Sequence, residues 1–156
     1  MVEYCSRTIE PELWLSLEAF GAVQIAGPKW CGKTTTSKQF IRSAIDIDKV
    51  LASSPADKDR IELLPDSVLA GEKPRLIDEW QLSPGIWDAV RRNVDDIGGS
   101  GLFILAESSA VDSSKIKHSG AGRIGTIFMR TMSLHESGQS TGGVSLSDLF
   151  QGKDKV

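Results

Sequence analysis

The sequence is poor in several residue types, and each scarcity narrows the classes of protein that it can encode. Among 156 residues there are two cysteines, Cys5 and Cys31, and two histidines, His118 and His135. Two cysteines do not make a disulfide framework, and the four residues have none of the short paired spacings that zinc sites use. We therefore expect neither a disulfide-stabilised domain nor a zinc-binding domain.

Long apolar runs and an excess of basic residues are also missing. No stretch approaches the roughly 20 apolar residues of a membrane-spanning helix, and the first residues lack the basic-then-apolar layout of a signal peptide. The net charge of −3 gives no overall positive field to attract nucleic acid or anionic lipid. We expect a cytoplasmic protein with no membrane partner, and its charge gives no indication of a nucleic-acid partner.

The residues that are present fit one packed domain. Apolar residues make up 40% of the chain and charged residues 25%, which is typical of a globular core with a solvated surface. Segments of strand character alternate with segments of helix character, and this alternation predicts an α/β domain with a mainly parallel sheet between two layers of helices. The predicted strands are residues 22–27, 44–48, 74–80, 101–108 and 123–134, and the predicted helices are residues 10–20, 33–43, 51–64, 84–97 and a last helix that begins after Ser145.

Local signals mark the ends of two of these helices. Ser83 followed by Pro84 predicts an N-cap and a first helical residue for the helix over 84–97. Ser145 and Asp148 predict a capping box at the start of the last helix. Residues 135–145, which are polar and rich in glycine, are predicted to be flexible.

The stretch GPKWCGKTT matches the pattern G-x-x-x-x-G-K-[ST] of a phosphate-binding loop. A predicted strand precedes it and a predicted helix follows it, so that backbone N–H groups and the helix N-terminus converge on an anion. Lys33 is expected to reach the β- and γ-phosphates of ATP and to assist catalysis, the Thr34 hydroxyl to bind Mg²⁺, and the Thr35 hydroxyl to contact the α-phosphate. The complete set of predicted nucleotide-binding residues is Gly27, Pro28, Lys29, Trp30, Cys31, Gly32, Lys33, Thr34 and Thr35.

Trp30 and Cys31 are unusual residues for such a loop. They occupy its variable positions, where the loop contributes backbone amides, so their side chains do not oppose phosphate binding. The Trp30 side chain has three open placements: packed within the protein, lying across the loop, or facing a partner.

Two acids, Asp78 and Glu79, end the third predicted strand. In phosphate-loop ATPases an acid at the end of a buried strand holds Mg²⁺, and a neighbouring glutamate polarises the attacking water. We expect Asp78 to take the first role and Glu79 the second, which favours hydrolysis over phosphoryl transfer to a small molecule. This placement requires a strand between the loop strand and the acidic strand, and predicts the sheet order 5-1-4-3-2.

The strand over 101–108 is then central, and its end is expected to lie near the γ-phosphate. Ser108 and Ser109 are the candidates for sensing that phosphate, while Glu107 would repel it unless the carboxylate is paired or turned away. Arg123, which has glycines on both sides, is a candidate arginine finger within the chain or across a subunit boundary. Arg130 is a weaker candidate for the same role.

GAGRIG, residues 120–125, also matches G-x-G-x-x-G, but it leads into a strand. A dinucleotide fingerprint must follow a strand and open a helix, so that reading is rejected.

Together the loop, LIDEWQ, PGIWDAVRRNVD, HSGAGRIG and MRTMSLHESGQSTGGVSL resemble the N-terminal ATPase domain of prokaryotic AAA-type ATPases. These proteins usually continue into a C-terminal domain of unknown function. The likeness runs from about Tyr4 to Phe150, and it implies one AAA-type ATPase core over residues 1–156 without the C-terminal domain. It implies ATP and Mg²⁺ as ligands, supports the roles given to Lys33, Thr34, Asp78 and Glu79, and raises the expectation for Arg123.

The sequence departs from this family after the central strand, where Ala106-Glu107-Ser108 replaces threonine-glycine-serine. The departure affects the expectation of hydrolysis more than that of binding. The leading interpretation is an Mg²⁺-dependent ATPase that drives or switches an unknown protein partner, with a homo-oligomer required if Arg123 acts across a boundary. The alternatives are a nucleotide-binding interaction domain with little hydrolysis and, ranked last, a small-molecule kinase using Asp46 and Asp48.

Overall fold

The computed structural model describes residues 4–108, 119–141, 143 and 145–152. Its centre is a five-stranded sheet in the order β2-β3-β4-β1-β5, and all four strand pairings are parallel. This order confirms the predicted arrangement 5-1-4-3-2 read from the opposite edge. The strands are β1 (Ala22–Ala26), β2 (Ser43–Asp46), β3 (Arg75–Asp78), β4 (Phe103–Ala106) and β5 (Ile124–Phe128).

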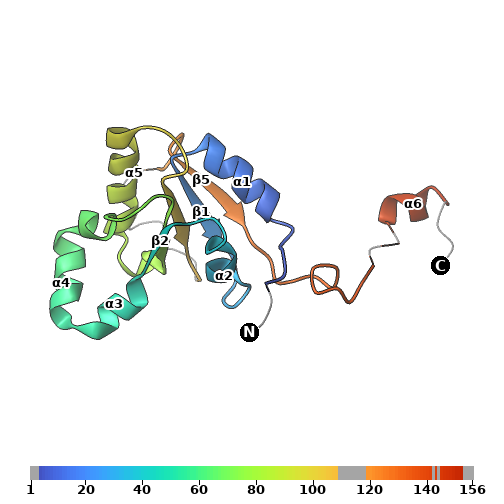
Figure 1. The fold of residues 1–156 in the computed structure, drawn as a ribbon, viewed down its shortest axis with the longest axis horizontal. Coiled ribbons are helices and arrows are strands. Elements are labelled where there is room, and N and C mark those ends of the chain that lie inside the picture. The colour runs from blue at the N-terminus through green and yellow to red at the C-terminus, as the bar shows by residue number, and fades with distance from the viewer. Residues whose placement is uncertain (1–3, 109–118, 142, 144, 153–156) are drawn as a thin grey trace.

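Helices cover both faces of the sheet, as Figure 1 shows. The helix α1 (Glu10–Ala19) lies on one face, where Leu13 and Leu17 pack against β1, β4 and β5. The helix α5 (Gly85–Ile97) lies on the other face, together with α3 (Ile47–Ser53), α4 (Pro55–Leu63) and two short 3₁₀ helices, η1 (Pro65–Val68) and η2 (Trp80–Leu82). The helix α2 (Lys33–Ser37) follows the phosphate-binding loop, and α6 (Leu146–Phe150) lies away from the sheet.

Alternation along the strands divides the core into two layers. On β1, Ala22 faces the α5 layer and Val23 faces the α1 layer, and both are fully buried. The central strand β4 is buried at all four positions, as expected for a strand covered on both faces. The carboxyl ends of β1, β3 and β4 therefore meet at one edge of the sheet, and the residues that follow them define the site.

Several predicted boundaries were wrong for identifiable reasons. The helix predicted over 33–43 ends at Ser37, because residues 34–36 are threonines of low helix propensity and residues 39–40 make i→i−3 turns before β2. The segment predicted over 51–64 belongs to two helices, which separate at Ser54 and Pro55. The strand predicted over 123–134 ends at Phe128.

The capping predictions had mixed outcomes. The Ser145–Asp148 capping box is confirmed, since the Asp148 amide donates to Ser145 Oγ at 3.0 Å. The Ser83 cap was wrong: α5 begins at Gly85, its N-cap position is Pro84, and no side chain caps it.

The segment predicted to be flexible, residues 135–145, begins within a hydrogen-bonded turn, and its flexibility stays a prediction. Residues 133–140 form a compact turn in which the amides of Gln139 and Ser140 both donate to the carbonyl of Leu134. This turn is held by Glu136, whose contacts are described below.

In the part of the chain that the structure describes, no helix is both long enough and apolar enough to cross a membrane.

Candidate nucleotide site

The phosphate-binding loop leaves β1 at Ala26 and turns into α2 at Lys33, as its sequence predicts. Gly27 is required for space, because a Cβ atom there would lie 2.2 Å from the carbonyl oxygen of Met129. Gly32 is required for conformation, because its φ of 102° lies in the left-handed region that glycine adopts without a steric penalty. Two backbone constraints at the ends of the turn therefore fix the shape of the loop.

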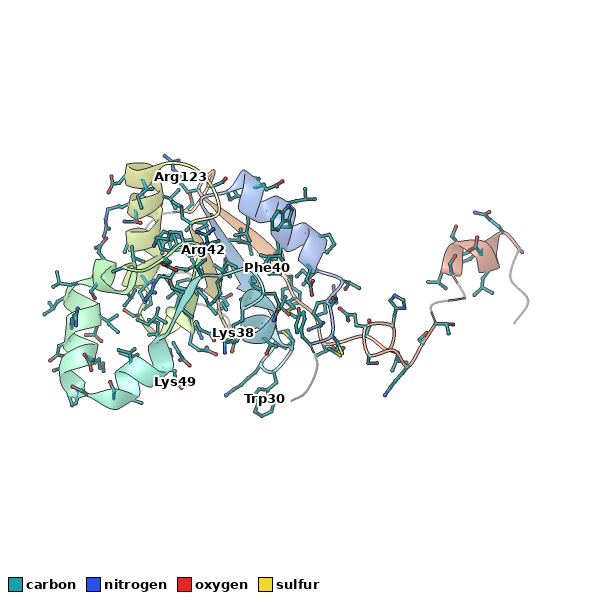
Figure 2. The ribbon with its side chains drawn as sticks, in the orientation of Figure 1. Trp30, Lys38, Phe40, Arg42, Lys49 and Arg123 are labelled. Atoms are coloured by element: carbon teal, nitrogen blue, oxygen red, sulfur yellow. The ribbon has the colours of Figure 1, made fainter. Side chains whose placement is uncertain are left out.

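Trp30, like Gly32, has a left-handed backbone conformation, although it is not a glycine. Its φ is 65°, and its side chain is 92% exposed, which excludes the predicted alternative of packing within the protein. The left-handed conformation costs a non-glycine residue about 1–2 kcal/mol. The Lys29 ammonium lies 5.6 Å from the centre of the Trp30 ring, and Figure 2 shows Trp30 projecting from the end of the molecule near α2.

Lys33 is buried and folded back onto its own loop. Its Nζ donates to the carbonyl oxygens of Gly27 at 2.9 Å and Pro28 at 2.7 Å, and it lies 3.8 Å from Cys31 Sγ. The ammonium is thus held where the loop closes, and its hydrogen-bond partners are neutral groups. An anion in the loop offers it a stronger partner than two carbonyls do.

Thr34 and Asp78 come together although 44 residues separate them. The Thr34 hydroxyl donates to Asp78 Oδ2 at 2.6 Å, joining the first turn of α2 to the carboxyl end of β3. Asp78 is only 8% exposed, so its carboxylate depends on this partner. The two residues predicted to hold Mg²⁺ therefore lie side by side.

Burial raises the pKa of Asp78 above its ordinary value, and the neighbouring carboxylates of Glu79 and Asp46 raise it further, while the Thr34 hydrogen bond opposes them. Asp46 lies opposite Asp78 in the pairing of β2 with β3. Asp46 itself caps α3 by accepting from the Lys49 amide at 3.3 Å, and it forms an ion pair with the Lys49 ammonium at 2.8 Å. Negative charge is thus concentrated at this edge of the sheet.

Glu79 follows Asp78 with a left-handed backbone, φ 55°, which breaks the strand and starts η2. Its two carboxylate oxygens accept hydrogen bonds from different side chains. Ser108 Oγ donates to Oε1 at 2.5 Å, and Gln81 Nε2 donates to Oε2 at 2.6 Å. Ser108 thus touches the glutamate predicted to activate water, and Ser109 lies outside the described residues.

Cavities lie on several sides of the loop. The first, called the loop cavity, has a volume of about 370 Å³, and its walls include Lys29, Trp30, residues 32–35, Glu79 and Ser108. The second, called the apolar cavity, has a volume of about 700 Å³ and is lined by Tyr4, Cys31, Gln39 and Met132 among others. Trp30, Gly32 and Thr35 line both cavities, so the two are neighbours at the loop.

Glu107 is not among the residues that line the loop cavity. It is 7% exposed and lines a different cavity together with Arg130, on the side of Gly27 and Pro28. Burial raises its pKa, while a hydrogen bond with Gln24 and the charge of Lys33 lower it. Its Oε2 has no hydrogen-bond partner among the described residues. The Glu107 carboxylate thus lies outside the walls of the loop cavity, and Lys33 is the cation that interacts with it.

The structure separates Arg123 from the other predicted catalytic residues. Arg123 precedes β5, whose first residue pairs with Ala22, whereas the phosphate-binding loop follows Ala26, about 13 Å further along the sheet. Its guanidinium forms an ion pair with Asp95 of α5 at 2.7 Å, and Figure 2 shows it at the opposite end of the molecule from Trp30. A finger acting on its own chain's loop was therefore the wrong alternative, and a role across a subunit boundary stays a prediction.

Sequence reasoning missed two residues behind the loop. The Arg7 guanidinium donates to the carbonyl of Cys31 at 2.6 Å and forms an ion pair with Glu136 at 3.0 Å. No periodicity or spacing links residues 129 positions apart, and the only available signal was the resemblance of the segment around Glu136 to the family. Gln81, which donates a hydrogen bond to Glu79, also belongs to a stretch that resembles the family, but the sequence predicted no function for it.

A parallel sheet in this order, with a phosphate-binding loop after β1 and an acid at the end of β3, defines a phosphate-loop NTPase domain. Comparison with protein families agrees, because residues 19–138 match the family described as AAA domain. The chain belongs to the AAA domain family of ATP-binding, phosphate-loop NTPases. A search of curated proteins gave no match.

Proposed function

We propose that this domain binds ATP with Mg²⁺ and hydrolyses it to ADP and phosphate. The observation that carries the proposal is the meeting of Thr34 and Asp78 at 2.6 Å beside a loop that holds Lys33, with Glu79 directly next in the chain. Folding brings Lys33, Thr34 and Glu79 to the walls of one cavity from two distant segments, with Asp78 hydrogen-bonded to Thr34 beside it. An accidental loop match would not place an acid there.

Each residue has a distinct role in the proposal. The backbone amides of the loop and Lys33 bind the phosphates, with Lys33 exchanging its two carbonyl partners for phosphate oxygens. Glu79 accepts hydrogen bonds on both oxygens and retains a lone pair on each, with which it can orient a water and accept its proton.

Thr34 and Asp78 are the residues that would hold Mg²⁺. Among the described residues no three His, Cys, Asp or Glu side chains are grouped to hold a metal ion. Mg²⁺ in nucleotide sites needs only one or two protein ligands, because phosphates and waters complete its shell. When bound, the ion neutralises charge on the phosphates.

The apolar cavity is the proposed place of the adenine base. It adjoins the loop cavity at Trp30 and Thr35, so one ATP molecule can place its base there and its phosphates in the loop. Tyr4 and Met132 provide apolar surface, and Gln39 provides an amide for the polar edge of a base.

Measured phosphate release from ATP tests this proposal. With Mg²⁺, the wild type is expected to turn over ATP, and Glu79→Gln is expected to lose most turnover while still binding ATP. Removing Mg²⁺ is expected to abolish turnover. Equal phosphate release by the wild type and Glu79→Gln would contradict the assignment of Glu79 and of hydrolysis.

A second candidate is a nucleotide-binding interaction domain with little hydrolysis that signals to an unknown protein partner. The observation that favours it is the engagement of both Glu79 oxygens by Gln81 and Ser108, which leaves the carboxylate less free to act on water. The same assay separates the two: ATP binding with phosphate release no greater than that of Glu79→Gln supports the second candidate.

A further inference from the structure

Arg7 and Glu136, neither of which the sequence predicted as a site residue, form a long-range buried ion pair, and Arg7 also lines the apolar cavity. The Arg7 Nε to Glu136 Oε1 distance is 3.0 Å, and both side chains are 5% exposed. Buried charges are costly unless paired and hydrogen-bonded, and removing one partner leaves the other uncompensated. The pair joins the N-terminal segment to a segment 129 residues later, and because it is buried it is not an ordinary solvent-exposed surface pair.

Glu136 satisfies both of its oxygens with donors from two segments. Oε1 accepts from the Thr8 amide at 2.7 Å, as well as from Arg7, and Oε2 accepts from the Ser133 amide at 2.6 Å. These bonds hold the pKa of Glu136 well below its ordinary value, with the Ser133 amide as the largest cause. The carboxylate is therefore the centre that orders residues 133–140.

The Arg7 guanidinium also reaches the phosphate-binding loop. Its Nη1 donates to the Cys31 carbonyl at 2.6 Å, and its Nη2 donates to the Arg130 carbonyl at 2.9 Å. The same Nη1 would lie 2.9 Å from a Cβ atom on Gly32, so only glycine lets the guanidinium approach this closely. One planar group thus contacts the loop, the chain just after β5, and Glu136.

The contact with Cys31 controls the direction of the next amide. The Cys31–Gly32 peptide bond is trans, and in a trans peptide the C=O and the following N–H point to opposite sides. Fixing the Cys31 carbonyl toward Arg7 therefore turns the Gly32 N–H away from Arg7. Gly32 lines both the loop cavity and the apolar cavity, and Arg7 lines the apolar cavity. An amide turned away from Arg7 is therefore the one that we expect a phosphate in the loop cavity to contact.

We propose that the Arg7–Glu136 pair positions the phosphate-binding loop and couples its nucleotide state to the exit segment, residues 129–140. The inference rests on the proposed nucleotide binding at this loop. A phosphate that fixes the Gly32 amide also fixes the Cys31 carbonyl, and so holds Arg7 and Glu136 in place. By linkage, order in the exit segment favours nucleotide binding to the same extent that nucleotide favours order. Figure 1 shows the chain continuing from this segment toward α6, away from the sheet.

The test combines ATP titration calorimetry with amide hydrogen exchange on the full chain. Arg7→Lys keeps the positive charge but cannot contact all three acceptors with one planar fork. We expect its affinity for ATP with Mg²⁺ to fall at least tenfold. The matched control is Arg92→Lys, because Arg92 pairs with Asp66 at 3.1 Å on the surface, and its affinity is expected to stay within twofold of the wild type.

Exchange of the amides of residues 129–140 gives a readout that loop damage alone would not produce. In the wild type, saturating ATP is expected to slow this exchange, and in Arg7→Lys saturating ATP is expected to leave it unchanged. If Arg7→Lys does not fold, Glu136→Gln is measured in its place.

The outcomes distinguish the two proposals. Wild-type protein that binds ATP without any change in exchange over residues 129–140 overturns the coupling, with no variant needed. Arg7→Lys binding ATP as tightly as the wild type overturns the positioning role. Wild-type protein that does not bind ATP refutes the proposed function itself, and the inference with it.

Discussion

The hydrogen bond between Thr34 and Asp78 makes a quantitative prediction about stability. Thr34→Val removes the hydroxyl with little change in shape or helix propensity, and leaves Asp78, 8% exposed, without its 2.6 Å partner. Hydrogen bonds to charged groups contribute about 1.5–3 kcal/mol. We therefore expect the free energy of unfolding to fall by about 2 kcal/mol at neutral pH, or about 6 °C in Tm for a domain of this size.

The pKa of Asp78 adds a second, independent signature. The Thr34 hydrogen bond lowers this pKa against the effect of burial, so the variant's Asp78 has a higher pKa than that of the wild type. As the pH falls, Asp78 becomes protonated in the wild type and in the variant. The hydrogen bond from Thr34 to the charged form then no longer contributes to the stability of the wild type. The difference in stability between the two proteins is therefore present at neutral pH and shrinks in acid.

Urea unfolding followed by circular dichroism measures this difference. The matched control is Thr35→Val, because Thr35 is the next residue of α2 and is exposed, and its change is expected to stay within about 0.5 kcal/mol. Equal stabilities of Thr34→Val and Thr35→Val would refute the reasoning. So would a Thr34→Val deficit that does not diminish in acid.

Three further predictions concern Trp30, Arg123 and Glu136. Because Trp30 lines both cavities, ATP is expected to change the tryptophan emission of the wild type, and Trp30→Phe is expected to lose that change. If Arg123 acts across a subunit boundary, turnover per molecule rises with protein concentration in the wild type but not in Arg123→Ala; a flat wild-type dependence argues against that role. Glu136 has a lowered pKa, so the stability it contributes is present above its ordinary value of 4.5 and is lost as the pH falls below it. Glu136→Gln is expected to flatten that acid loss in unfolding experiments, and an unchanged slope would contradict it.

The sequence predicted the sheet order and the meeting of Thr34 with Asp78 for one physical reason. The residues that follow parallel strands all lie at the same edge of the sheet. A loop after β1 and an acid at the end of β3 are therefore close together when only β4 separates these two strands. The same reasoning explains why Arg123 does not reach its own chain's loop. It precedes its strand, and so lies at the edge opposite to the phosphate-binding loop.

Other features depend on tertiary contacts that local patterns do not encode. The left-handed backbones of Trp30 and Glu79 are unfavourable locally and are imposed by the loop and by η2. The turn at residues 133–140 has a composition typical of flexible segments, yet one carboxylate orders it through a guanidinium that precedes α1. A glycine-rich polar segment can thus form a defined turn when one of its carboxylates pairs with a buried guanidinium far away in the sequence.

Calorimetric titration with ATP and Mg²⁺ of the wild type and Lys33→Met tests the central claim most directly. Lys33→Met removes the buried ammonium and keeps a side chain of similar length, and loss of a charge-assisted hydrogen bond of about 1.5–3 kcal/mol corresponds to roughly a 10- to 150-fold weaker Kd. We predict a single ATP site in the wild type and a loss of at least tenfold in Lys33→Met. No heat of binding in the wild type, or equal affinity in both proteins, would contradict the account.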